Sequence, residues 1–189
     1  MDKIKKWNYL QNLHSKTEWY RYYGEYSLAI KNLLEGSEDS QSTVLALPVL
    51  FLIRHSLELA FKMNLVELEK VSGEKANLKF HGKDSHVLHK LHHEFQKQVE
   101  LIFKKAKAPQ TLRKEFNKRN IQLKDFRQIF DKLDEWSFAF RYPVTPDGKT
   151  KSFKPEDQIN IADIIPVYEE TQTILKYTTD VIDELINAK

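Results

Sequence analysis

The sequence predicts an all-α protein, a bundle of four to six helices, and two observations indicate this fold class. The chain of 189 residues has only 5 Gly and 6 Pro, whereas sandwiches and barrels need many turns. Apolar residues instead recur at helical spacing along several long segments, and no segment alternates long enough to indicate a strand. Because there is no internal repeat and no shift in composition, we expect residues 1–189 to form a single domain.

The first helix is predicted from its ends. The S-K-T-E run that begins at Ser15 has the form of a capping box, in which Glu18 reaches back toward the N-cap. From there a helix can run to Leu34, and Gly36 follows as a natural stop. Residues 7–13, just before it, are compatible with a short helix of their own.

The second predicted helix, residues 43–71, is expected to lie at the centre of the bundle. It follows a polar loop over residues 37–42 and is apolar on nearly all sides of its middle. A helix that is apolar all round is typically a buried one. Residues 71–83 then form a polar linker that contains Gly73 and Gly82.

Three elements follow this linker. Asp84-Ser85 offers an N-cap for a helix that extends to about residue 107 and carries an apolar stripe at helical spacing. Residues 112–136 are expected to form one helix, or two helices broken near Asn120. A final helix is predicted over residues 162–187, again with one apolar face.

Between the last two of these helical segments the chain is expected to be irregular. Pro143 biases Tyr142 toward extended backbone, so residues 140–143 leave helical geometry. The Pro-Asp-Gly run over residues 146–148 is typical of a turn.

Composition excludes several classes of protein. Hydrophobic residues make up 41% of the chain and charged residues 30%, which is typical of a globular domain. The absence of cysteine excludes disulfides, thiolate metal sites and a Cys nucleophile. A net charge of +3 permits RNA or another acidic partner without predicting one.

The sequence also indicates the cellular location of the protein. The most apolar run, residues 44–53, is much shorter than the roughly 20 residues of a spanning helix, so we expect no membrane segment. The basic N-terminus has no apolar stretch behind it and is not a secretory signal. We therefore expect a cytoplasmic protein.

An ionic cluster interrupts the apolar second helix. Arg54, Glu58 and Lys62 are spaced i, i+4, i+8, and His55 lies beside them, so that all four fall within an arc of roughly 100°. Apolar residues bound this arc at both ends, and burying charges is costly unless they are paired. We therefore expect this cluster to have either a functional or a structural role.

Two interpretations of the cluster remain open. In the functional one, His55 exchanges a proton, Glu58 orients it or acts as a base, and two cations, Arg54 and Lys62, hold an anion such as phosphate. In the structural one, the charged side chains pair with one another and anchor a loop or a second subunit.

A second polar element could join the cluster. Arg141 and Tyr142 lie in the irregular segment, where a scaffold often carries its binding residues. The alternative is that Phe140 and Tyr142 plug the bundle while Arg141 pairs with an acid.

Five of the seven histidines lie within residues 81–93. His86, His89 and His93 share one arc of a helix, which resembles a zinc site, but the apolar stripe lies opposite. We therefore expect a solvated face, no metal site and no cofactor. His86 is the exception, because it begins the helix and can turn inward. The sequence also lacks the phosphate-binding, dinucleotide-binding, nucleophile-elbow and zincin motifs.

The motifs together resemble those of small bacterial and phage HEPN-like proteins. The run L-P-V-L-F-L-I-R-H-S-L-E-L over residues 47–59 is similar to their core helix, which carries R-H-x-x-E-L. An H-x-L-x-x-L element then corresponds to residues 86–91, F-R-Y-P to residues 140–143 and a D-G turn to residues 147–148. The resemblance spans most of the chain. It implies a helical bundle that often dimerises, and for many members metal-independent cleavage of RNA in phage-conflict and toxin–antitoxin systems.

The chain departs from the HEPN hallmark, which is Arg followed after four to six residues by His on one helix. After Arg54 the nearby histidine is His55, so the standard ribonuclease mechanism lacks its pair. Catalysis would need another set, for example His55 or His86 as acid and base, with Arg54 or Arg141 on the phosphate.

Two functions are therefore expected. The first is a non-catalytic, HEPN-like binding or regulatory module that forms a homodimer, with a cluster that is structural or binds a nucleotide or partner protein. The alternative is a metal-independent ribonuclease, which requires the site residues to converge in one open pocket. The catalytic candidates are Arg54, His55, Glu58 and His86, and the binding candidates are Lys62, Arg141 and Tyr142.

Overall fold

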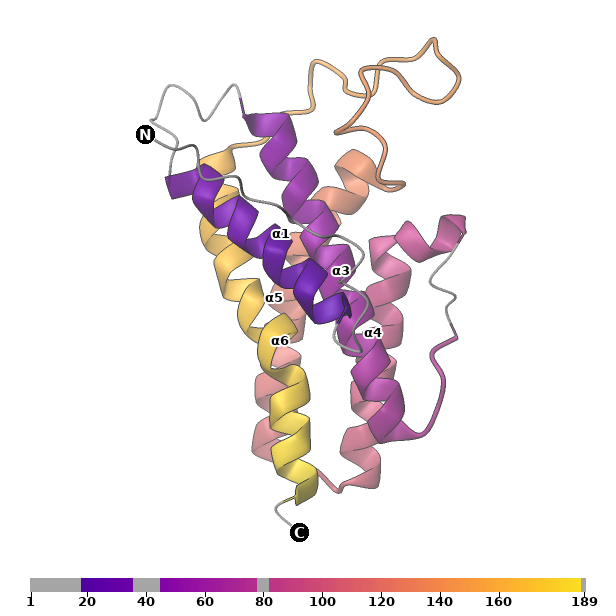
Figure 1. The fold of residues 1–189 in the computed structure, drawn as a ribbon, viewed down its shortest axis with the longest axis vertical. Coiled ribbons are helices and arrows are strands. Elements are labelled where there is room, and N and C mark those ends of the chain that lie inside the picture. Colours follow the sequence, from indigo (N-terminus) through magenta and orange to yellow (C-terminus); the bar gives the residue numbers. More distant parts are fainter. Residues whose placement is uncertain (1–17, 36–44, 78–81, 188–189) are drawn as a thin grey trace, which may run out of the picture.

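The structure is a computed structural model that describes residues 18–35, 45–77 and 82–187. Within these residues the chain forms five α-helices and a short 3-10 helix (Figure 1). The elements in order are α1 (Glu18–Glu35), α3 (Ala46–Ser72), η2 (Lys83–His86), α4 (Leu88–Lys105), α5 (Gln110–Asp134) and α6 (Ile161–Asn187). Extended pairing in the described residues is limited to one isolated bridge, between Val144 and Lys151. The expected all-α bundle is confirmed.

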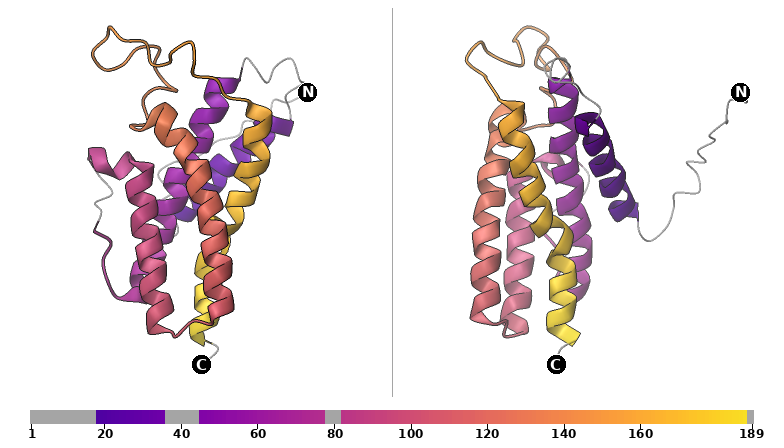
Figure 2. Two further views of the ribbon diagram at one scale, coloured as in Figure 1. Left: turned by 180° about the vertical axis from the view of Figure 1, so that it is seen from behind. Right: turned by 90° about the vertical axis from the view of Figure 1, so that its left-hand side faces the viewer.

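Helix α3 is the centre of the bundle. It contacts α1, α4 and α6, while α5 packs between α4 and α6. The right-hand view of Figure 2 shows α1 lying against α3 on the outside of the other four helices. Every residue from Ile53 to Leu65 except His55 is buried. The apolar surface on all sides of α3 thus meets three neighbouring helices, as predicted.

One predicted helix boundary is wrong. The Asp84-Ser85 pair does not cap α4, which begins at Leu88 after an extended Val87. The Ser85 hydroxyl instead donates back to the Gly82 carbonyl at 2.7 Å and so closes the turn of η2. Of the two alternatives for residues 112–136, the single helix is present, because α5 continues through Asn120.

The remaining boundaries agree with expectation where they are described. Helices α3 and α6 begin and end within a few residues of their predicted limits. Residues 135–160, here called the α5–α6 connection, are irregular, and Asp147 accepts from the Lys149 and Thr150 amides within its turn. The expected capping box at residues 15–17, the short helix at 7–13 and the loop at 37–42 lie outside the described residues. None of the described helices is long and apolar enough to cross a bilayer.

A buried hydrogen-bond network explains why α5 continues through Asn120. The Asn120 side-chain oxygen accepts from His92 Nε2 on α4 at 2.7 Å. The other ring nitrogen, Nδ1, accepts from Arg127 Nε at 3.1 Å, and Arg127 also pairs with Asp131. Both nitrogens of His92 are thereby used in its neutral form, and burial lowers the pKa of His92 to about 4.

We predict that acid weakens the fold through His92. The unfolded state has the ordinary pKa of 6.5, so it binds more protons than the folded state between pH 6.5 and 4. Stability is therefore complete above pH 6.5, and this contribution, about 3 kcal/mol, is lost as the pH falls to about 4. Urea unfolding at pH 7 and pH 4 measures it. His92→Gln should shrink the difference between the two values, while the exposed control His89→Gln should keep it; equal pH dependence in all three proteins would contradict the assignment.

Candidate functional site

Arg54 joins three segments of the chain inside the bundle. Its side chain is completely buried. The guanidinium donates to the backbone carbonyls of Asp134 at 2.8 Å, His86 at 2.7 Å and Glu135 at 3.1 Å, and to Glu58 at 3.3 Å. The carbonyls at residues 134 and 135 end α5 and have no partner within the helix. A cation at a helix C-terminus also interacts favourably with the helix dipole.

Asp134 completes the exit of the chain from α5. One of its carboxylate oxygens accepts from the backbone amides of Phe138 and Ala139. The other lies 3.6 Å from Arg54 Nε, and the side chain is 1% exposed. Arg54 and Asp134 together fix the direction in which the α5–α6 connection begins.

Glu58 is the second buried ion of the cluster. One oxygen lies 2.6 Å from Lys62 Nζ and 2.9 Å from His86 Nδ1, and the other accepts from Arg54. Burial alone would raise the pKa of Glu58, but Lys62, His86 and Arg54 together hold that pKa below its ordinary value. Glu58 is therefore a carboxylate at neutral pH, with both of its oxygens facing donors.

Lys62 and His86 complete the cluster in different ways. Lys62 is buried, and its ammonium lies 5.8 Å from the ring centre of Trp19 as well as against Glu58. The His86 side chain is 49% exposed although its Nδ1 faces the buried carboxylate. Because Glu58 is a carboxylate and can only accept, Nδ1 of His86 carries a proton toward it, and in the neutral tautomer of this form Nε2 is an acceptor.

His55 does not join the cluster. Its ring stacks on Phe51 at 5.8 Å and meets the ring of Tyr26 on α1 edge-on at 4.6 Å. Burial lowers the pKa of His55 by more than the charge of Glu58 raises it. A neutral histidine packed between aromatic rings serves the α1–α3 contact rather than acid–base chemistry at Glu58.

Arg141 and Tyr142 lie on the exposed side of the α5–α6 connection. The Arg141 guanidinium sits over the rings of Phe51 at 5.7 Å and Tyr142 at 5.4 Å, and it donates to the Ser137 carbonyl. Phe140 is buried, but Tyr142 is 47% exposed. The structure therefore brings Arg54, Glu58, Lys62 and His86 together. It leaves His55, Arg141 and Tyr142 outside that cluster.

A hollow of about 540 Å³ opens beside His86. It lies between η2, the end of α5 and the α5–α6 connection, which Figure 1 draws in orange at the top of the molecule. Asp134 and Trp136 both line it, and neither is among the residues predicted from the sequence. An aspartate in the last turn of a helix lies beside the negative end of the helix dipole, which is unfavourable. Its position at the end of the predicted helix could therefore have indicated that Asp134 has a cationic partner.

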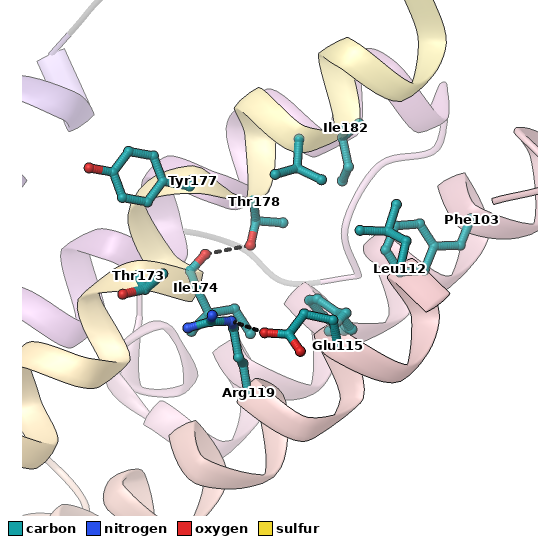
Figure 3. A pocket seen from close by; sticks show the side chains of 11 residues that line it. Phe103, Leu112, Glu115, Arg119, Thr173, Ile174, Tyr177, Thr178 and Ile182 are labelled. Atoms are coloured by element: carbon teal, nitrogen blue, oxygen red, sulfur yellow. Dashed lines mark hydrogen bonds and ion pairs between the residues drawn. The ribbon is translucent and has the colours of Figure 1, made fainter. Parts of the chain in front are cut away.

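A second hollow, of about 270 Å³, lies between α5 and α6 near the far end of the bundle. Figure 3 shows its lining, in which Glu115 and Arg119 of α5 are paired with each other. The other walls are mainly apolar and include Phe116, Ile174 and Ile182. The other polar groups in the lining are the hydroxyls of Thr173, Tyr177 and Thr178.

Comparison with known proteins does not indicate a chemistry for this chain, and neither do the metal-ligating residues that the structure describes. No family model, no curated protein and no solved structure matches this chain. Among the described residues, no three or more His, Asp or Glu side chains are placed to hold a metal ion. His89 and His93 are exposed, as the solvated face predicts.

We predict that Arg54→Met lowers the free energy of unfolding by about 3–5 kcal/mol, because it leaves Asp134 buried without its cation and removes the donor to the carbonyls of His86 and Glu135. Urea unfolding at pH 7 measures the change. Arg141→Met is the matched control, and we expect it to cost less than about 1 kcal/mol because the Arg141 side chain is exposed. Equal stability of the two variants would show that the Arg54 contacts do not hold the fold.

Proposed function

We propose that the chain is a non-catalytic, HEPN-like binding or regulatory module in a bacterial phage-conflict or toxin–antitoxin setting, acting as a cytoplasmic homodimer. The observation that carries the proposal is the burial of Arg54, whose donors face three backbone carbonyls and Glu58. An arginine that holds a substrate phosphate needs donors that reach the substrate. Four of the five N–H donors of Arg54 face acceptors of the protein itself, and the side chain is completely buried, so the cluster supports the module instead of performing a reaction.

The supported element is the α5–α6 connection. Arg54 and Asp134 anchor its first turn, and its surface then presents Trp136, Arg141 and Tyr142. Exposed tryptophan, tyrosine and arginine side chains are the types that dominate binding energy at protein interfaces. A loop held by a buried ionic cluster can present such side chains without losing much conformational entropy when it binds.

One observation favours the ribonuclease alternative. The His86 ring reaches solvent while its Nδ1 faces the carboxylate of Glu58, which is how a general acid–base histidine is oriented. However, the hollow beside His86 has no lysine or arginine in its lining, and Asp134 and Glu135 lie in its wall. Transition states of phosphoryl transfer carry negative charge, which the exposed Glu135 carboxylate would repel and no lysine or arginine in the lining would stabilise. The binding module is therefore the better-supported function.

We predict that the purified chain does not cleave RNA through its histidines. The test incubates fluorescently labelled single-stranded and hairpin RNAs with the chain in EDTA and follows product by gel electrophoresis. The wild type should match the His86→Ala and His55→Ala variants at the level of a blank. RNA cleavage that disappears in His86→Ala and persists in the exposed control His89→Ala would establish the ribonuclease alternative and overturn the proposal.

A further inference from the structure

The hollow beside His86 has the size and the walls of a small-molecule site. Its volume of about 540 Å³ falls within the roughly 300–1,000 Å³ range of ligand pockets. Trp136 and Phe138 supply aromatic surface, and the Trp136 side chain is 52% exposed. Both rings belong to the segment that Arg54 and Asp134 anchor. The hollow is thus built by a fixed part of the structure.

Two buried polar atoms of lining residues lack hydrogen-bond partners. Ser152 Oγ and Asp134 Oδ2 are buried and make no hydrogen bond to the described residues. Arg54 Nε lies 3.6 Å from Asp134 Oδ2, which is too far for a hydrogen bond of ordinary length. Buried polar atoms in folded proteins are nearly always satisfied. Donors reaching these atoms from the hollow, directly or through a bound water, would satisfy them.

The polar groups of the hollow favour a ligand that donates hydrogen bonds. Asp134 can only accept, and in the tautomer of His86 whose Nδ1–H faces Glu58 the other ring nitrogen, Nε2, is an acceptor. The lining contains Glu135 but no lysine or arginine. An anionic ligand would therefore find carboxylates and no balancing cation, whereas N–H groups would find several acceptors.

We propose that this hollow binds a planar nitrogen heterocycle with N–H donors, of the nucleobase type, as a base or nucleoside rather than a nucleotide. The ring stacks against Trp136 or Phe138, and its N–H edge points toward His86, Asp134 and Ser152. A phosphate group on the ligand does not strengthen binding, because the lining contains no lysine or arginine to pair with it. This inference rests on the proposed binding function and names the class of ligand.

The test is a titration of the ¹⁵N-labelled full chain with adenosine, cytidine, guanosine and uridine, followed by NMR. We expect the amides near Trp136 and Ser152 to shift, with a Kd of about 1 mM or tighter for at least one amino-bearing base. The matching 5′-monophosphate should bind no more tightly than its nucleoside. Trp136→Ala should weaken binding by about tenfold, because stacking on an aromatic ring contributes about 1–3 kcal/mol per base. Since Trp136 is half exposed, this variant keeps the fold, and His89→Gln should bind like the wild type.

Three outcomes would overturn the inference. These are no binding of any nucleoside up to about 10 mM, tighter binding of the monophosphate, and binding that Trp136→Ala leaves unchanged. Free arginine is titrated in the same way. If arginine occupies the hollow and the nucleosides do not, the hollow is instead a site for a cationic side chain of a partner. Nucleosides have no scissile phosphodiester bond. The titration therefore tests ligand binding, whereas the RNA assay tests catalysis. A negative titration leaves the non-catalytic module standing, and RNA cleavage would overturn that module whether or not a nucleoside binds.

Discussion

The buried guanidinium of Arg54 is the interaction on which the arrangement of the functional end of the bundle depends. It lies in the central helix α3 and holds the carbonyls that end α5 and η2, segments about 80 and 30 residues away in the chain. Removing this side chain would leave unsatisfied carbonyls and the buried Asp134 carboxylate without its cation, which costs far more than the loss of a surface contact. The cluster therefore gives a unique position to a connection that has little regular structure of its own.

This constraint also decides what chemistry the cluster can perform. Charges that are directed at one another are not available to a substrate, and Arg54, Glu58 and Lys62 are all buried and paired. His86 is the point at which the cluster reaches solvent, and it does so at the hollow beneath the α5–α6 connection. The buried cluster thus fixes the position of the walls of that hollow. Phosphate chemistry there would lack a cation.

Sequence reasoning predicted the features that depend on one helix and missed those that depend on two. The all-round apolar surface of α3 and the Arg54–Glu58 pairing follow from spacing along a single helix, and both are present. Asp134 could not be assigned to the cluster because only the packing of α5 on the bundle brings it to Arg54. Asn120 is a poor helix former by itself, yet its bond to His92 on α4 keeps α5 continuous. His55 shares the arc of the cluster but lies on the side that α1 covers.

The account is tested most directly by native-state hydrogen exchange of the unmodified protein at neutral pH. The amides of Phe138 and Ala139 donate to the buried Asp134 carboxylate, just beyond the end of α5. If the cluster fixes this connection to the core, these two amides exchange only through global unfolding, with the same opening free energy as the amide of Leu57 in α3. Exchange through a local opening several kcal/mol cheaper than global unfolding would contradict the account. It would mean that the connection moves independently of the buried ions.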